Sequence, residues 1–346
     1  MHYSTQEMKR YLMATVIFVA CPLLFLAINP TAIKHYGEFS SFFWTYLTKH
    51  QVVAPNAIGV LSDFLIFHLI FFAVYPKRRV TSDRLLKLLD SSVSLLRGRH
   101  LIDFTDTEWL NIRVYLVKLF FAPLMILFVT SLFRDLADNG HSLLLNLSES
   151  KFYFMTFALV LMSCMFIIDV SCFCLGYFTE SKRLDNVIRS VDPTVSGWLV
   201  CLICYPPFSA NMHNIFGNMY EIGAIMPDPY MTFVLTVVGL SLMLVYTKAS
   251  VDLLFKASNL TYRGLVTSGT YSIVRHPAYT SKVLTWTILT LPFVAKNPWL
   301  IFTILAWSTI YILRALTEER HLLIADREKY FTYMKRVPYR FIPGVI

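Results

Sequence analysis

The C-terminal region concentrates side chains that can do chemistry around two apolar segments. Arg275 and His276 precede the first segment, and Arg314, Glu318 and Glu319 lie at the end of the second. Charged groups beside apolar spans are costly unless they line a polar cavity or pair with one another. Arginine forks bind carboxylates through two parallel hydrogen bonds, whereas carboxylates and aromatic rings hold cations. The region therefore predicts a site for charged ligands at one end of a hydrophobic hairpin.

Tyrosines accompany these charges at four positions, Tyr271, Tyr279, Tyr330 and Tyr333. Their ring faces attract cations. A different explanation treats the arginines as anchors at the membrane surface and the tyrosines as an aromatic belt. That explanation accounts for any one of these residues, but it does not require their order along the chain.

The composition indicates which elements must position these groups. Hydrophobic residues make up 56% of the 346-residue chain, charged residues make up 15%, and the mean hydropathy is +0.55. Soluble domains carry about a quarter charged residues. We therefore predict an all-α fold, a polytopic membrane helical bundle of about eight transmembrane helices. The expected spans are Tyr11–Ile28, Ala57–Tyr75, Val114–Phe133, Phe152–Phe178, Val195–Phe208, Met231–Thr247, Tyr279–Val294 and Trp299–Leu316.

The basic residues predict how this bundle is oriented. Of the 31 Lys and Arg residues, 24 fall in segments on one side of the expected spans and 5 fall in the opposite segments. Basic residues collect on the cytoplasmic side of membrane proteins, so both termini are expected there. The net charge of +9 fits a surface that faces anionic lipid and requires no nucleic acid. Pro206 and Pro207 interrupt the fifth expected span, which leaves a re-entrant segment as the alternative.

The chain is expected to divide near residue 250. Residues 1–250 would form an N-terminal transmembrane bundle, and residues 251–346 would form a C-terminal catalytic region. Residues 76–113 have the Leu and basic content of an amphipathic cytoplasmic helix, which would lie at the membrane surface or pack on the bundle. Cys201 and Cys204 have redox or zinc spacing, but further donors are absent nearby and no metal is expected.

Two ionisable residues, Lys118 and Asp169, lie inside expected spans. Such side chains are expensive within a membrane. They mark either a functional site or a buried structural ion pair, and the sequence leaves both explanations open.

The reactive residues at the C-terminus form an ordered set of motifs, with Arg314 and Glu319 five residues apart. The set consists of Leu265, Val266, Thr267, Gly269, Tyr271, Arg275, His276, Pro277, Tyr279, Arg314, Glu318, Glu319, Tyr330, Tyr333, Lys335, Arg336, Val337 and Pro338. It resembles the isoprenylcysteine carboxyl methyltransferase (protein-S-isoprenylcysteine O-methyltransferase) family over less than a quarter of the chain. The chain departs from the family pattern at Ser281, Lys282, Asp326 and Arg327. The His-Pro-x-Tyr element is also similar to elements in phospholipid N-methyltransferases and membrane sterol reductases.

This resemblance implies an integral-membrane enzyme whose C-terminal hairpin and tail bind S-adenosyl-L-methionine at the cytoplasmic face. The expected cofactor-binding residues are Tyr271, His276, Pro277, Tyr279, Glu318, Tyr330 and Tyr333, and the expected catalytic residues are Arg275, Arg314 and Glu319.

The side-chain chemistry agrees with methyl transfer to a carboxylate. A carboxylate is ionised near neutral pH, so its methylation needs alignment by an arginine fork and removal of water, but no general base. The expected acceptor is an isoprenylated cysteine or similar amphiphile, a lipid or lipidated protein that enters from the bilayer. The alternatives are a phospholipid N-methyltransferase, an NADPH-dependent sterol or isoprenoid reductase, and a membrane scaffold or transport protein without enzymatic activity.

Overall fold

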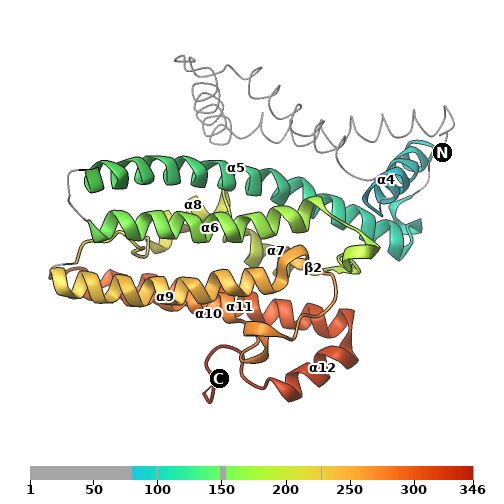
Figure 1. The fold of residues 1–346 in the computed structure, drawn as a ribbon. Helices are drawn as coiled ribbons and strands as arrows, with labels where there is room; N and C mark the ends of the chain where they lie inside the picture. The colour runs from blue at the N-terminus through green and yellow to red at the C-terminus, as the bar shows by residue number, and fades with distance from the viewer. Residues whose placement is uncertain (1–79, 99, 149–152, 227, 346) are drawn as a thin grey trace, which may run out of the picture. The chain divides into compact units, whose positions relative to one another are not determined.

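The computed structural model describes residues 80–98, 100–148, 153–226 and 228–345, and helices dominate these residues (Figure 1). The first two expected spans, Tyr11–Ile28 and Ala57–Tyr75, lie outside the described residues. Two short strands, β1 (Ser190–Val191) and β2 (Thr261–Tyr262), pair antiparallel. The α-helices are α4 (Val80–Leu96), α5 (Asp106–Ser148), α6 (Phe154–Phe178), α7 (Val195–Leu202), α8 (Phe208–Phe216), α9 (Pro229–Leu253), α10 (Pro277–Thr290), α11 (Trp299–Ala325) and α12 (Arg327–Arg336).

Four stretches of the described residues are helical, long and apolar enough to cross a membrane. They are Asp106–Leu147, Phe154–Phe178, Pro229–Lys256 and Trp299–Ala325. Between 33% and 53% of the apolar window in each helix is buried inside the structure, so much of the apolar surface faces outward. On α11, for example, Ile301 and Leu305 are 50% and 60% exposed. Exposed aliphatic side chains along a long helix are typical of contact with lipid.

Two expected spans do not appear as full-length crossing helices. The segment expected over Val195–Phe208 contains α7, whose eight residues extend only about 12 Å, against a hydrocarbon core of about 30 Å. Pro206 and Pro207 follow α7 and separate it from α8. The segment expected over Tyr279–Val294 contains the 14-residue α10 and a 3₁₀ turn over Leu291–Phe293. The structure therefore supports four of the eight expected crossings. It does not support a crossing by a single continuous helix at the fifth expected span, Val195–Phe208.

The chain divides into two compact units. One contains the described residues up to Arg134 together with Tyr177–Ile188, and the other contains Asp135–Gly176 and the residues from Arg189 onward. All the site residues expected from the sequence belong to the second unit.

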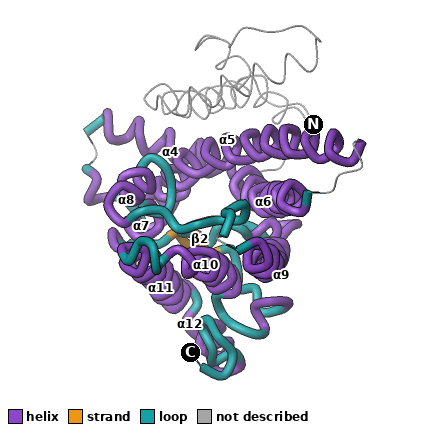
Figure 2. The backbone as a smooth tube through the Cα atoms, turned by 90° about the vertical axis from the view of Figure 1, so that its left-hand side faces the viewer, coloured by secondary structure: helices purple, strands orange, loops and turns teal. Residues whose placement is uncertain are grey.

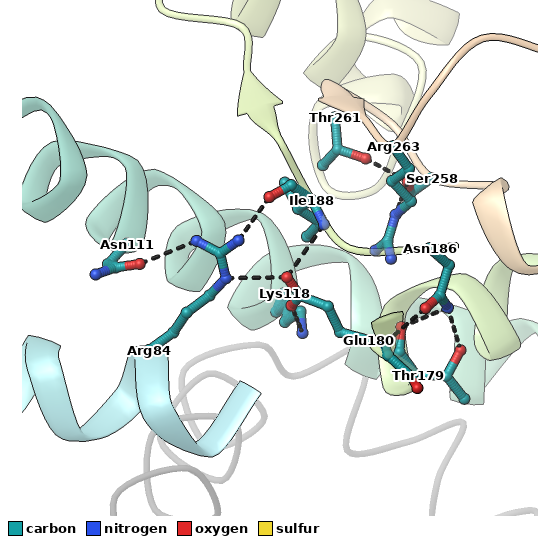
Figure 3. Close-up of polar contacts among 11 residues, drawn as sticks. Arg84, Asn111, Lys118, Thr179, Glu180, Asn186, Ile188, Ser258, Thr261 and Arg263 are labelled. Carbon is teal, nitrogen blue, oxygen red and sulfur yellow. Dashed lines mark hydrogen bonds and ion pairs between the residues drawn. The ribbon is translucent and has the colours of Figure 1, made fainter. Parts of the chain in front are cut away.

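A buried carboxylate organises the first unit (Figure 3). Glu180 accepts hydrogen bonds from Arg84 Nε at 2.9 Å and from Lys118 Nζ at 3.0 Å. Arg84 also donates to Asn111 Oδ1 at 3.0 Å and to the carbonyl of Ile188 at 2.5 Å. These bonds attach α4 to the rest of the unit. Of the two alternatives for the helix expected over residues 76–113, they favour packing on the bundle over lying at the membrane surface. Lys118 belongs to a buried structural ion pair, but its partner is Glu180 and not Asp169, the partner expected from the sequence.

The core of the second unit lies among α6, α9 and α10, and α10 packs on both α9 and α11 (Figures 1 and 2). Asp169 of α6 accepts hydrogen bonds from Tyr246 at 2.8 Å and from Ser250, both on α9. The buried apolar residues of this core are Ala158, Met165, Ile222, Met226, Leu240, Met243 and Leu289.

Local sequence signals fix the helix ends that frame the site. Asp228 caps α9 by accepting a hydrogen bond from the backbone of Met231 at 2.6 Å, and α10 begins with Pro277. Asp326 caps α12 through the backbone of Lys329 at 3.4 Å. Such caps satisfy backbone donors that have no partner within the helix.

A close approach at Gly269 joins the end of α9 to the segment that leads into the site. Gly269 has a φ of +63°, and a Cβ at this position would collide with the Asp252 carboxylate. The same carboxylate accepts hydrogen bonds from Thr270 N at 2.8 Å and Thr270 Oγ1 at 2.9 Å. Only glycine meets both the positive φ and the lack of space without strain.

Candidate functional site

Glu319 gathers three basic side chains at the end of α11. Its carboxylate accepts from Arg275 Nη1 and Arg340 Nε, at 3.3 Å and 3.0 Å, and it contacts His276 Nε2 at 3.1 Å. Glu319 is only 3% exposed, and Arg275 and His276 are also buried. Removing one partner of a buried charge cluster leaves an uncompensated charge, so this network is expected to be sensitive to substitution.

The chain after α12 returns across the start of α10. Arg275 N and His276 N donate to the carbonyls of Tyr339 and Arg340, at 3.0 Å and 2.9 Å. Arg275 Nη2 donates to the carbonyl of Pro338 at 3.1 Å, and the ring of Phe341 lies 5.8 Å from that of His276. The tail therefore completes the surroundings of the Glu319 network.

The neighbouring carboxylate, Glu318, has a different environment from Glu319. Consecutive residues of a helix point about 100° apart, and Glu318 is exposed whereas Glu319 is buried. Glu318 accepts a hydrogen bond from the hydroxyl of Tyr279 at 2.8 Å. The ring of Tyr279 stacks on that of His276, with centroids 5.5 Å apart, so the exposed carboxylate lies beside the buried network.

Arg314 lies in a separate setting of amide and aromatic groups. Its Nη2 donates to Asn259 Oδ1, which also accepts from the Tyr205 hydroxyl at 3.2 Å. The guanidinium carbon lies 5.2 Å from the ring centre of Tyr279 and 5.5 Å from that of Tyr205. Arg314 is 8% exposed and forms no ion pair with any residue that the structure describes. The two expected catalytic arginines therefore differ, because Arg275 has a carboxylate partner and Arg314 has none in this part of the chain.

Tyr330 and Tyr333 form an aromatic pair on α12, and Tyr271 contacts this pair through its backbone. Tyr330 and Tyr333 are buried, and the Tyr333 hydroxyl donates to the carbonyl of Tyr271 at 2.7 Å. Burial raises the pKa of all three tyrosines above the usual value, so their hydroxyls stay protonated at physiological pH. They serve as neutral donors and ring faces rather than as bases.

A cavity of about 510 Å³ opens between the loop at residues 265–267 and α12. Its lining has equal numbers of acidic and basic side chains. The lining residues are Leu265, Thr267, Asp326, Glu328, Lys329, Thr332, Tyr333 and Arg336.

Three site residues were absent from the sequence prediction. Asn259 and Tyr205 contact Arg314 from two loops, and Arg340 reaches Glu319 from the tail. The basic residues of the tail gave a weak signal for Arg340. Nothing in the spacing of Asn259 and Tyr205, which lie 54 residues apart, indicates that they share a hydrogen bond.

Comparison with known proteins gives one match. Residues 233–325 match the model of the phospholipid methyltransferase family. The matched residues run from the first turns of α9 to the end of α11 and include Arg275, His276, Arg314 and Glu319, but not α12 or the tail. No curated protein and no solved structure matches the chain. Together with the four helices long enough to cross a membrane, the family match, which covers about a quarter of the chain, supports a membrane-associated methyltransferase.

Proposed function

We propose that the protein is an S-adenosylmethionine-dependent carboxyl methyltransferase that acts on an isoprenylated cysteine or a similar amphiphile. The observation that carries this proposal is the buried guanidinium of Arg314, which has no carboxylate partner among the described residues. A buried charge without a partner is costly, so the arrangement is matched to an anion that arrives with the acceptor. The planar fork of arginine fits a carboxylate.

The donor set around His276 fits the methyl donor. S-adenosylmethionine carries a carboxylate and cationic groups, and it supplies an activated methyl group when bound. Glu318 and the ring of Tyr279 suit its cationic groups. Arg275 Nε is buried and has no hydrogen-bond partner within the described residues, which suits an anionic group. Tyr271, Pro277, Tyr330 and Tyr333 would complete the cofactor's surroundings.

Arg314, Arg275 and Glu319 have distinct roles in this proposal. Arg314 holds the acceptor carboxylate, and the rings of Tyr205 and Tyr279 exclude water from it. Glu319 orients Arg275 and His276. When bound, S-adenosylmethionine would supply its methyl group to a carboxylate oxygen held by Arg314 and would leave as S-adenosylhomocysteine, and no proton would move, because the carboxylate is already ionised at neutral pH. The acceptor reaches the site sideways from the bilayer, since the outer faces of these helices are apolar.

A phospholipid N-methyltransferase is the second candidate, and the description of the matched family favours it. An ammonium acceptor must lose a proton before it can be methylated, so this reaction needs a base. Glu318 is the exposed carboxylate at the site and would take that role.

Methyl incorporation from labelled S-adenosylmethionine separates the two candidates. Detergent-purified protein is offered a farnesylated cysteine, its unprenylated counterpart and phosphatidylethanolamine side by side. We expect labelling of the farnesylated cysteine, with much weaker labelling of the unprenylated one, because each buried methylene contributes about 0.8 kcal/mol. Labelling of phosphatidylethanolamine alone would establish the second candidate. Calorimetry with S-adenosylhomocysteine and NADPH tests the cofactor, and binding of NADPH alone would reject both.

A further inference from the structure

Lys282 places a second cation near the proposed acceptor site. It is the sixth residue of α10, about 8 Å along the helix from Pro277. Its ammonium lies 4.9 Å from the ring centre of Trp286 and 5.4 Å from that of Tyr246. Within the described part of the chain it makes no hydrogen bond or ion pair, and its interactions are these ring contacts and a longer-range electrostatic attraction to Asp169.

The carboxylate of Asp169 already accepts hydrogen bonds from two other side chains. Asp169 accepts hydrogen bonds from Tyr246 at 2.8 Å and from Ser250. It forms no ion pair with Lys282 among the described residues. Tyr246 thus presents its hydroxyl to Asp169 and its ring face to Lys282.

A continuous aromatic wall connects Lys282 to Arg314. The ring of Trp286 lies 5.6 Å from that of Tyr311, which lies 5.6 Å from that of Tyr279. Tyr279 is the ring that faces Arg314, at 5.2 Å. Both cations therefore border the same wall, which is built by α10 and α11.

The ammonium group of Lys282 requires an acceptor that the rings do not provide. A lysine carries three donors, and a ring face attracts the charge without accepting a strong hydrogen bond. Ionisable groups at this depth in a membrane protein usually pair or mark a ligand path. Two cations on one wall attract an anionic group. They repel a head group that carries an ammonium and no anionic group.

We propose that Lys282 is a specificity-determining residue that, with Arg314, selects amphiphiles carrying a carboxylate or phosphate near their apolar chain. This inference rests on the proposed function for the location of the acceptor. It adds a second contact for the anion, on α10, to the arginine on α11.

Paired ligands that differ in a single anionic group test the inference. The full-length protein in detergent, without S-adenosylmethionine, is titrated with N-acetyl-S-farnesylcysteine and its methyl ester, and with phosphatidic acid and diacylglycerol. We expect the wild type to bind the anion of at least one pair roughly tenfold more tightly than its uncharged partner. Lys282→Met should lower that ratio several-fold, and Lys282→Arg should preserve most of it. A preference confined to the carboxylate pair identifies the lipidated cysteine as the source of the anion, and one confined to the phosphate pair identifies a phospholipid.

Lys296→Met is the matched control, because Lys296 is an exposed lysine beyond the other end of α10. An unchanged ratio in Lys282→Met, an equal drop in Lys296→Met, or no preference in the wild type would each overturn the inference. The measurement requires no turnover. A protein that keeps the preference but transfers no methyl group would reject the proposed function alone, and methyl transfer without the preference would reject this inference alone.

Discussion

Arg314 and Glu319 lie five residues apart on one helix but belong to different networks. Glu319 shares its carboxylate among Arg275, His276 and Arg340, whereas Arg314 rests on Asn259 and on aromatic rings. A spacing of five residues turns a helix by about 500°, so the two side chains point in different directions. The separation leaves the buried Arg314 guanidinium without a carboxylate partner among the described residues.

Replacing Arg314 by lysine tests the fork directly. Arg314→Lys keeps the positive charge but loses the planar, two-point donor geometry. We expect turnover to fall at least about tenfold with a much smaller change in thermal stability, since each lost charge-assisted hydrogen bond is worth roughly 1.5–3 kcal/mol. Labelled methyl transfer and thermal unfolding measure the two effects.

Two further variants control this experiment. Arg320→Lys changes an exposed arginine on the same helix, whose guanidinium donates to Thr194 and Ser196, and it should leave turnover near the wild-type value. Asn259→Asp supplies a carboxylate partner to Arg314 and should inactivate the enzyme more strongly than Asn259→Ala. Equal turnover in Arg314→Lys and the wild type would rule out two-point binding.

At this scale, the sequence predicted which residues belong to the site better than it predicted which residues contact one another. Arg275, Arg314 and Glu319 were expected as one catalytic set and His276 as a cofactor-binding residue, whereas the structure brings Arg275, His276 and Glu319 into one network and places Arg314 outside it. Asn259 was not expected, because its contact with Arg314 depends on how the chain turns after α9. Residue types limit which chemistry is possible, whereas the pairing of distant residues depends on tertiary packing.

At the scale of elements, α12 is held in place by Asp326, its N-cap residue. The Tyr262 hydroxyl on β2 donates to Asp326 at 2.9 Å, and Asp326 also accepts from Lys329 Nζ at 3.1 Å. The bonds from Lys329 and Tyr262 hold the pKa of Asp326 below its usual range. Burial, followed by the bond to Asp326, raises the pKa of Tyr262 to about 12.

These shifts predict how the stability contributed by Tyr262 depends on pH. Its folded pKa of about 12 lies above the unfolded value of about 10. The contribution is therefore complete below about pH 10 and is lost as the pH rises through 12. We expect Tyr262→Phe to lower the unfolding midpoint by a constant amount between pH 6 and about 9, and by less at higher pH. Tyr339→Phe, at an exposed tyrosine, serves as the control, and a Tyr262→Phe effect that grows above pH 10 would contradict the argument.

Element lengths were the weaker part of the sequence prediction. The apolar runs over Phe152–Phe178 and Trp299–Leu316 correspond to long helices, α6 and α11. The run over Val195–Phe208 is equally apolar, but its helix ends at Leu202, before the two prolines. Hydropathy measures how readily a segment is buried, and it does not distinguish a crossing helix from a short helix packed inside a bundle.

At the scale of the whole molecule, the short α10 raises the question of whether it crosses. The distribution of basic residues predicts that Ser272 lies on the cytoplasmic side and Lys296 on the opposite side. We expect an impermeant maleimide to label Lys296→Cys in intact cells and Ser272→Cys only after permeabilisation. The unsubstituted protein controls for labelling of the native cysteines. Labelling of both variants from the same side would show that α10 does not cross the membrane.

The contact between the tail and the start of α10 also determines when the site can form during synthesis of the chain. The carbonyls of Tyr339 and Arg340, which accept from Arg275 and His276, follow α12 in the chain. A ribosome synthesises these residues after it has synthesised α10, α11 and α12. The Glu319 network is therefore incomplete on every nascent chain, and its assembly waits until the tail has been synthesised.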